Sequence, residues 1–275
     1  MTGSSPGAVL LVGAGRMGGA LIKGWLSAKR FSAVHVVEPQ PSDAMKALAA
    51  SRAITIHDGF KSGSLPPLDA IVLDVKPQVL KGQTALLREL GKTGALILSI
   101  AAGISTVFLS AGLGSEARLV RAMPNTPGAI GRGITVLHTG GGLSAADRAL
   151  AETLMASLGE TLWLEDESLM DAVTAVSGSG PAYVFLMAEA FAAAARAQGL
   201  PPEIADRLAR ATISGAGALL AADPRAAAAL RQEVTSPGGT TEAALNVLTA
   251  SDGLSELMAR AIAAATERGK QLGKG

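Results

Sequence analysis

The chain has 275 residues, of which 48% are hydrophobic and 17% charged, and this balance excludes a disordered polyelectrolyte. A net charge of +1 and an aromatic content of 3% argue against a nucleic-acid partner, which requires a basic face or stacking side chains. The chain has no cysteine, and its three histidines (His35, His57 and His138) are far apart in sequence, so we expect neither a disulfide nor a bound metal ion.

Short apolar runs alternate with helical stretches from the amino terminus to about residue 164. The predicted strands are Ala8–Val12, Ala33–Val37, Asp69–Val75, Ala95–Ile100, Ala117–Ala122, Gly133–His138 and Thr161–Leu164. The helices predicted between them include Arg16–Ala28, Gln78–Leu90 and Ser144–Leu158. This alternation predicts an α/β, doubly wound parallel sheet, and the continuous apolar strands fit a sheet covered on both faces.

One segment, Thr93–Ser115, carries no charge and is long enough to span a bilayer. Glycine and serine residues interrupt it, so we interpret it as a buried strand, a glycine loop and a short helix. The first seven residues lack the basic region of a signal peptide. The sequence therefore predicts a soluble, cytoplasmic protein without a membrane partner. A membrane-associated protein built around this segment is the alternative, and it predicts detergent-dependent solubility.

The pattern changes at the acidic stretch Glu165-Asp166-Glu167, after which no strand is predicted. Long alanine-rich helices are predicted over Pro181–Gln198, Pro202–Ala222, Thr240–Ala250 and Leu254–Leu272. We therefore expect two domains, residues 1–165 with the sheet and residues 166–275 as an all-α domain. Residues 183–187 place apolar side chains on more than one helix face, which requires burial on several sides. This predicts a homo-oligomer.

A dinucleotide site is predicted at Gly13–Gly18, a G-x-G-x-x-G that follows a strand and opens a helix. Gly13 permits the tight turn, Gly15 admits a pyrophosphate, and Gly18 lets the helix pack on the strand. Glu38 ends the second strand, 20 residues after Gly18, where a carboxylate can bind an adenosine ribose and repel a 2′-phosphate. The alternatives are a glycine turn without a ligand and an ordinary surface glutamate.

Three further loops follow predicted strands and therefore lie at the edge where such sheets bind ligands. They are Lys76-Pro77, Ala101-Ala102-Gly103 and Met123–Pro127. The small Ala101 and Ala102 would let a flat ring lie against backbone, and Lys76 could reach a ribose or a phosphate. Asn125, held between two prolines, suits a binding loop and equally a plain turn.

Two glycine-rich segments precede helices in the second half, Ser177–Pro181 and Ser236–Thr241. In the latter, a run of backbone N–H groups from Gly238 to Thr241 has little side-chain cover and could cradle a carboxylate. A flexible lead-in to a helix is the alternative for both. No nucleophile–base pair stands out, which favours reduction of a C=N bond, because an iminium needs mainly positioning and charge stabilisation. Thr241 or Ser236 could steer its nitrogen.

Together these motifs resemble the pyrroline-5-carboxylate reductase family over nearly the whole chain. The segments that carry the resemblance are Gly13–Gly18, Val75–Gln78, Ala101–Gly103, Met123–Pro127, Ala175–Tyr183 and Glu233–Thr241, of which the last two are the specific ones. The resemblance implies a Rossmann-like domain followed by a helical dimerisation domain. It also implies a homodimer whose helices interlock, with assembly into a higher oligomer of dimers open.

The resemblance further implies reduction of L-1-pyrroline-5-carboxylate, a cyclic imine carboxylate, to L-proline by NADPH or NADH. The residues it assigns to the cofactor are Gly13, Gly15, Arg16, Met17, Gly18, Glu38, Val75, Lys76, Pro77, Ala101, Ala102 and Asn125. Gly239, Thr240 and Thr241 would receive the substrate carboxylate. Thr241, near the ring nitrogen, and Ser236, on the same loop, are the catalytic candidates.

Three departures from the family pattern stand in the sequence. Glu38-Pro39-Gln40 replaces residues suited to a 2′-phosphate and leaves the choice between NADH and NADPH open. Ala222-Asp223-Pro224 stands where Glu-His-Pro is common, and Glu233 replaces an amide. The alternative functions are a reductase of another cyclic imine or of a deazaflavin cofactor, and a dinucleotide-binding protein without catalysis.

Overall fold

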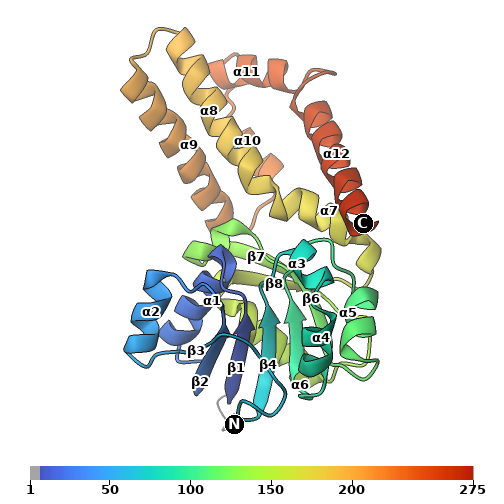
Figure 1. The fold of residues 1–275 in the computed structure, drawn as a ribbon. Coiled ribbons are helices and arrows are strands. Elements are labelled where there is room, and N and C mark those ends of the chain that lie inside the picture. The colour runs from blue at the N-terminus through green and yellow to red at the C-terminus, as the bar shows by residue number, and fades with distance from the viewer. Residues whose placement is uncertain (1–6, 275) are drawn as a thin grey trace. The chain divides into compact units, whose positions relative to one another are not determined.

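The computed structural model describes residues 7–274, which fall into two compact units. The α/β unit comprises the chain up to Gly178 together with Thr266 onward, and the helical unit comprises Ser179–Ala265 (Figure 1). The helical segment before Gly178 and the last turns of the final helix therefore group with the sheet.

The α/β unit is built on one eight-stranded sheet with the order β3-β2-β1-β4-β5-β6-β7-β8. Its strands are β1 (Ala8–Val12), β2 (Ala33–Val37), β3 (Thr55–His57), β4 (Leu68–Leu73), β5 (Leu96–Ser99), β6 (Leu119–Met123), β7 (Gly133–His138) and β8 (Gly159–Trp163). β1 to β6 are parallel, whereas β7 runs antiparallel to β6 and parallel to β8. The predicted α/β fold is confirmed, with β7 and β8 as its reversed edge.

Seven strands lie where the sequence predicts them, within a few residues at their ends. β3 was not predicted because it has only three residues and carries a mixture of polar and apolar side chains at a sheet edge. Such a strand is recognised only through its partner, and His35, Val36 and Val37 of β2 supply that partner.

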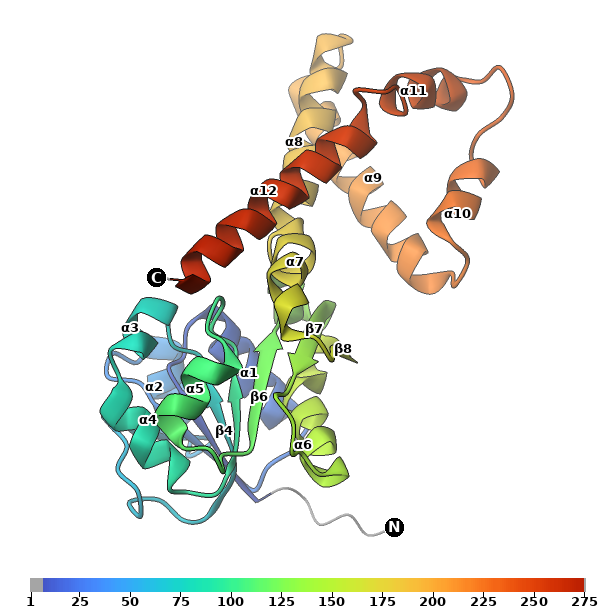
Figure 2. The same cartoon turned by 90° about the vertical axis from the view of Figure 1, so that its right-hand side faces the viewer.

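Helices cover both faces of this sheet, as Figure 2 shows with α4 and α5 on one side and α6 on the other. The helices of the α/β unit are α1 (Arg16–Ser27), α2 (Asp43–Ala50), α3 (Pro77–Lys81), α4 (Thr84–Gly91), α5 (Thr106–Leu113), α6 (Ala145–Met155) and α7 (Met170–Val173). The single helix predicted over 78–90 is in fact two helices, because α3 ends at the cap residue Gly82. The uncharged segment 93–115 forms β5, a glycine loop and α5, as predicted.

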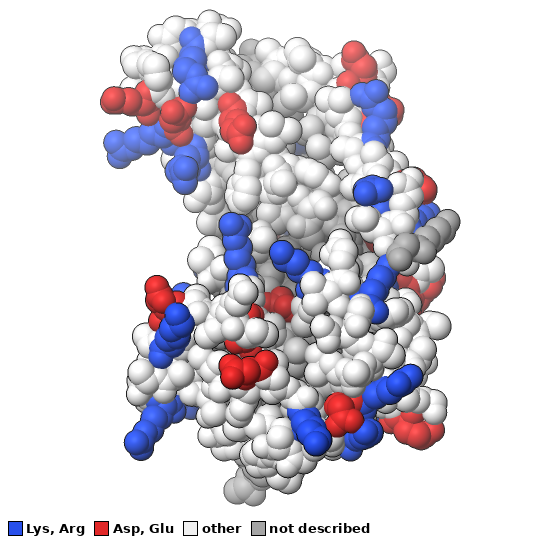
Figure 3. Space-filling model, in the orientation of Figure 1, with Lys and Arg blue, Asp and Glu red and all other residues white. Residues whose placement is uncertain are grey.

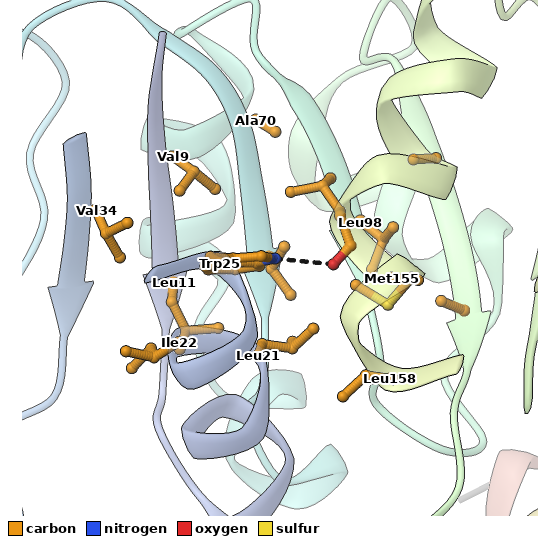
Figure 4. Packing of buried hydrophobic residues seen from close by; sticks show 14 of the residues in the cluster. Val9, Leu11, Leu21, Ile22, Trp25, Val34, Ala70, Leu98, Met155 and Leu158 are labelled. Atoms are coloured by element: carbon orange, nitrogen blue, oxygen red, sulfur yellow. Dashed lines mark hydrogen bonds between the residues drawn. The ribbon is translucent and has the colours of Figure 1, made fainter. Parts of the chain in front are cut away.

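Alternate residues of β1 point to opposite faces of the sheet and pack into two separate cores. Val9 and Leu11 join one apolar cluster with α1 and α6, while Leu10 and Val12 join a second on the opposite face. Trp25 lies at the centre of the first cluster and is 1% exposed (Figure 4). Its indole N–H donates to the carbonyl of Leu154 at 2.8 Å, which satisfies the polar atom of this large buried side chain.

The acidic stretch after β8 is held against the sheet by hydrogen bonds to the Glu167 carboxylate. Its carboxylate accepts from the Thr106 amide and hydroxyl at 2.8 and 2.5 Å and from the Arg121 guanidinium at 2.8 Å. Burial alone would raise the pKa of Glu167, but the hydrogen bonds from Thr106 and Arg121 and the charge of Arg121 hold it below its ordinary value. These bonds hold the start of the following segment against β6 and the amino terminus of α5.

The helical unit contains α8 (Gly180–Ala197), α9 (Pro202–Ala222), α10 (Ala227–Glu233), α11 (Thr240–Leu248) and the first turns of α12 (Leu254–Lys274). Helices α8 and α9 pack side by side as an antiparallel pair (Figure 1). Of its residues, all of which the structure describes, the buried ones are Ala192, Ala205 and Ala209. No strand occurs in it, as predicted. Over residues 7–274, no helix has the length and apolar character needed to cross a membrane.

Candidate active site

The carboxyl ends of β1, β2, β4 and β5 meet at one edge of the sheet. Because β1 lies between β2 and β4, successive connections leave it in opposite directions, which is the point where open α/β sheets bind ligands. The residues that follow these strands are Gly13 after β1, Glu38 after β2, Asp74 after β4 and Ile100 after β5, with Ala101 next to it. The predicted cofactor residues Gly13 and Glu38 therefore lie around one loop, and Asp74, which was not predicted, joins them.

Two positions of this loop require glycine because Asp74 approaches their backbone too closely for a side chain. Gly13 has φ of +81°, and a Cβ placed there would lie 2.3 Å from the carbonyl oxygen of Asp74. A Cβ on Gly18 would lie 2.6 Å from Asp74 Oδ2. Side chains at these positions would force the loop away from β4, so the glycines serve the turn and the packing that the sequence predicts.

Most backbone N–H groups of the glycine loop already have partners. Gly13 donates to the Val37 carbonyl at 2.9 Å, and Ala14 donates to Glu38 Oε2 at 3.0 Å. Gly15 and Gly18 both donate to Asp74 Oδ2, at 3.0 and 2.7 Å. Within residues 7–274, the two remaining N–H groups, those of Arg16 and Met17 at the start of α1, have no acceptor. Two free donors at a helix amino terminus form a cradle for an anion.

Glu38 is held by backbone on both carboxylate oxygens. Oε2 accepts from Ala14, and Oε1 accepts from the amide of Gln40 at 3.0 Å. The carboxylate therefore has a fixed position beside the glycine loop instead of a free surface location. This is the position from which an acidic residue can accept hydrogen bonds from an adenosine ribose.

Asp74 is a site residue that the sequence analysis did not single out. Burial raises the pKa of its carboxyl, the hydrogen bonds from Gly18 and Gly15 lower it in part, and the charge of Glu38 raises it further, so that the net shift is upward. The available signal was an aspartate directly after the buried apolar strand Leu68–Leu73, because a carboxylate at such an end meets the loops of neighbouring strands.

The other loops at this edge of the sheet differ in how many side chains and polar groups they leave available to a ligand. Lys76 caps α3 with an exposed side chain, and Val75 and Pro77 flank it. Ala101 is buried against the second cluster, whereas Ala102 is exposed. The amide group of Asn125 is committed to structure, because Oδ1 accepts from Ile134 N at 3.0 Å and Nδ2 donates to the Ser177 carbonyl at 3.1 Å.

The glycine segment before α11 offers a second pair of free donors within the helical unit. Of the four amides that the sequence predicts to be open, Gly238 donates to Glu242 Oε2 at 2.7 Å and Gly239 donates to the Ser236 carbonyl at 3.0 Å. In the part of the chain that the structure describes, the amides of Thr240 and Thr241 have no acceptor. They form an anion cradle smaller than expected, with the Thr241 side chain beside it.

The other glycine segment, Ser177–Pro181, is not an open helix start. A π-helix over Thr174–Gly178 leads directly into α8, and the Ala182 amide donates to the Ser179 carbonyl at 3.0 Å. The segment continues one helical run into the next, so its glycines do not expose a cradle comparable with that of α11.

Charged side chains of both signs are interspersed over the face shown in Figure 3, and neither sign forms an extended continuous surface there. His, Asp and Glu side chains of residues 7–274 form no group of three that could hold a metal ion.

Comparison with known proteins shows the family. A curated pyrroline-5-carboxylate reductase of Pseudomonas aeruginosa is 39% identical to this chain over 265 residues, which is 96% of each protein. The chain belongs to the pyrroline-5-carboxylate reductase family. Within it, residues 167–272 match the model of pyrroline-5-carboxylate reductase dimerisation, and residues 8–103 match a model described as NADP oxidoreductase coenzyme F420-dependent. The resemblance predicted from the sequence is thereby confirmed.

Solved structures of this family share the whole architecture. The pyrroline-5-carboxylate reductase from Coxiella burnetii superposes with a TM-score of 0.90 at 33% identity, covering 99% of this chain and all of the other. The Plasmodium falciparum enzyme, whose structure has NADP bound, gives a TM-score of 0.80 at 26% identity over 98% of this chain and all of the other. The succession of an α/β part and a helical part is common to them.

Proposed function

We propose that this protein reduces L-1-pyrroline-5-carboxylate to L-proline with a hydride from NADPH or NADH, the final step of proline biosynthesis. The observation that carries the proposal is the pair of helix amino termini with two free donors each, at Arg16 and Met17 and at Thr240 and Thr241. The substrates of this reaction carry one anion for each cradle, a diphosphate and a carboxylate.

The glycine loop fits the dinucleotide on the evidence of its own geometry. A Cβ on Gly13 or Gly18 would clash with Asp74, so the loop requires glycine at both positions. The two free amides at the start of α1 can bind an anion. In this proposal Arg16 and Met17 hold the diphosphate by their amides, Glu38 binds the adenosine ribose, and Val75, Lys76, Pro77, Ala101 and Ala102 line the cofactor. Asn125 keeps its loop in place through Ile134 and Ser177.

When bound, the reduced nicotinamide supplies a hydride to the imine carbon. The ring nitrogen, protonated as an iminium, becomes the amine of proline when the C=N bond accepts the electron pair. The amides of Thr240 and Thr241, preceded by Gly239, hold the carboxylate, and the Thr241 hydroxyl orients the nitrogen. The Ser236 carbonyl accepts a hydrogen bond from the Gly239 amide, and this bond closes the loop. Positioning and charge stabilisation carry the reaction.

The first test is oxidation of NADH or NADPH followed by absorbance with and without the imine. Oxidation that depends on the imine is expected with at least one coenzyme. Binding of a coenzyme without turnover would favour the dinucleotide-binding protein, and turnover only with another cyclic imine would change the substrate.

The role of Thr241 is tested by Thr241→Ala, with Thr249→Ala at the other end of α11 as the matched control. A hydrogen bond to a charged group is worth about 1.5–3 kcal/mol, so we expect kcat to fall roughly tenfold to a hundredfold. Coenzyme affinity should be unchanged. A kcat equal to that of the control would remove Thr241 from the mechanism.

The coenzyme choice is tested by Glu38→Ser, with Glu38→Gln to retain an acceptor for Ala14. Loss of a charge beside the ribose removes like-charge repulsion on the order of 1 kcal/mol, so the ratio of kcat/KM for NADPH to that for NADH should rise about fivefold. An unaltered ratio in both variants would show that Glu38 does not face the 2′ position.

We further propose a cytoplasmic homodimer formed through the helical unit, with larger assemblies of such dimers as an extension. The match of residues 167–272 to a dimerisation model and the exposed apolar side chains of α8 and α9 support this. We propose the boundary between the cofactor domain and the dimerisation domain near residue 165, at the acidic stretch.

A further inference from the structure

We propose that the negative charge of Asp74 sets both the affinity and the pH dependence of dinucleotide binding. This inference rests on the proposed function, because it takes the diphosphate of the coenzyme as the anion at the start of α1. It concerns a residue for which neither the sequence pattern nor the family match assigns a role.

The carboxylate of Asp74 is hydrogen-bonded to the glycine loop. Asp74 Oδ2 accepts from Gly15 N at 3.0 Å and from Gly18 N at 2.7 Å, two donors of the glycine loop that normally face an anion. The free amides of Arg16 and Met17 lie between these two residues in the chain. A diphosphate bound by them is therefore an immediate neighbour of Asp74, and part of the positive end of α1 is already neutralised by a carboxylate of the protein itself.

The elements next to Asp74 carry charged groups of both signs. Glu38, at the end of β2, is the charged group that acts on its carboxyl, and it adds a second negative charge. Arg16 at the start of α1 and Lys76 beyond β4 are the cations on the adjoining segments. In residues 7–274 neither forms an ion pair with Asp74. The incoming diphosphate thus meets two carboxylates that are hydrogen-bonded to the loop.

A bound diphosphate should favour the protonated form of Asp74. Burial already favours the neutral form, and the pKa of Asp74 lies above its ordinary value. A diphosphate beside it disfavours the ionised form further, so binding raises this pKa and takes up a proton. Affinity should then increase as the pH falls. Because Asp74 also holds Gly15 and Gly18 in place, it organises the loop when no coenzyme is present.

The experiment uses ADP-ribose as the probe, because it contains the diphosphate but lacks the nicotinamide. Binding is measured by calorimetry between about pH 5.5 and pH 8, where the diphosphate itself does not titrate, in buffers of different ionisation heat. The wild-type protein should take up a fraction of a proton per ADP-ribose bound and should bind several-fold more tightly at the acidic end. This measurement needs no variant.

The decisive variant is Asp74→Asn, which keeps an oxygen to accept from Gly15 and Gly18 and removes only the charge. We expect its Kd for ADP-ribose to be about tenfold lower than that of the wild type near neutral pH, without proton uptake and nearly independent of pH. Asp69→Asn is the matched control, since it removes the same charge from the other end of β4 and should behave as the wild type.

The outcomes separate the inference from the proposed function. Wild-type or weaker affinity in Asp74→Asn, or proton uptake that persists in it, would overturn the role of Asp74 even when imine-dependent turnover is found. Absence of ADP-ribose binding in the wild type would overturn the inference by removing the diphosphate from α1. Turnover of NADH or NADPH, measured separately, decides whether the proposed function falls with it.

Discussion

The two units of this protein bury apolar surface in different ways. The α/β unit buries large side chains such as Trp25, Leu11 and Leu73 in two clusters, one on each face of the sheet. The helical unit buries only Ala192, Ala205 and Ala209 among its residues, all of them described. Large side chains stay exposed along its helices, namely Val184, Phe185, Leu186, Phe191, Ile204, Leu208, Leu219 and Leu220 on α8 and α9.

The difference follows from the number of layers that each unit can form. A sheet with helices on both faces closes its cores within one chain, because every strand residue points to one covered face or the other. A pair of packed helices covers only one stripe of each helix and leaves the opposite stripe open. The apolar residues on that stripe indicate a partner, and the matching family model is a dimerisation model.

The largest expected effect is in the self-contained core. Trp25→Ala removes a fully buried ring and leaves the Leu154 carbonyl without its donor, so we expect a loss of about 3–5 kcal/mol of unfolding free energy. Trp163→Ala is the comparison, since that ring is only half-buried, packs against the edge of the same cluster with Arg148 over its face, and should cost much less. Urea unfolding measures both, with the remaining tryptophan as the probe. Equal losses would contradict the separate role of the core.

A smaller effect is expected where the chain after β8 is tied to the sheet. Glu167→Gln leaves the buried Arg121 without a countercharge, which should cost about 2–3 kcal/mol at neutral pH. The folded pKa of Glu167 is depressed, so its contribution is present above the ordinary carboxyl pKa and is lost as the pH falls through the folded value. The wild type and the variant should therefore converge in acid.

Unfolding by urea across a range from neutral to acidic pH checks this convergence. Glu160→Gln, at an exposed position of β8, serves as the control and should follow the wild type throughout. A gap between wild type and Glu167→Gln that stays constant into acid would show that the carboxylate charge is not the source of the stability.

The smallest effect in a single subunit is expected in the helical unit. Phe185 is 63% exposed, so Phe185→Asp should leave the stability of one subunit nearly unchanged. In a dimer the substitution occurs twice and removes apolar burial of about 1.5–3 kcal/mol at each position, which should weaken association by at least about a hundredfold. Light scattering over a dilution series measures the mass, and Leu162→Asp, 53% exposed on β8, is the control. An unchanged mass would place the interface elsewhere.

Much of the fold could be predicted because local pattern and final structure agree. The apolar strands Ala8–Val12 and Ala33–Val37 occur with the predicted ends, and the long helices of the second half lie close to their predicted limits. The short β3 and the break at Gly82 escaped prediction because they depend on a neighbouring strand and on local capping. The antiparallel direction of β7 likewise depends on pairing with β6, which no local pattern contains.

The candidate site was predicted unevenly for a related reason. Glycines at fixed spacing predict a turn, and Gly13–Gly18 forms that turn. Which of its amides remain free depends on acceptors supplied by distant segments, and Asp74 and Glu38 take three of them. In the second glycine segment, Glu242 takes an amide that the sequence suggests is open.

By itself, the sequence determined the alternation of strands and helices, the change to an all-helical second half, and the glycine loop of a dinucleotide-binding fold. These features depend on periodicity and on residues whose conformational freedom is intrinsic. Only the tertiary structure decided that Asp74 reaches Gly15 and Gly18, that Glu167 binds Arg121, and that the apolar residues of α8 and α9 stay uncovered. Those outcomes depend on which distant segments meet, because hydrogen bonds and burial are properties of pairs of segments and not of either one alone.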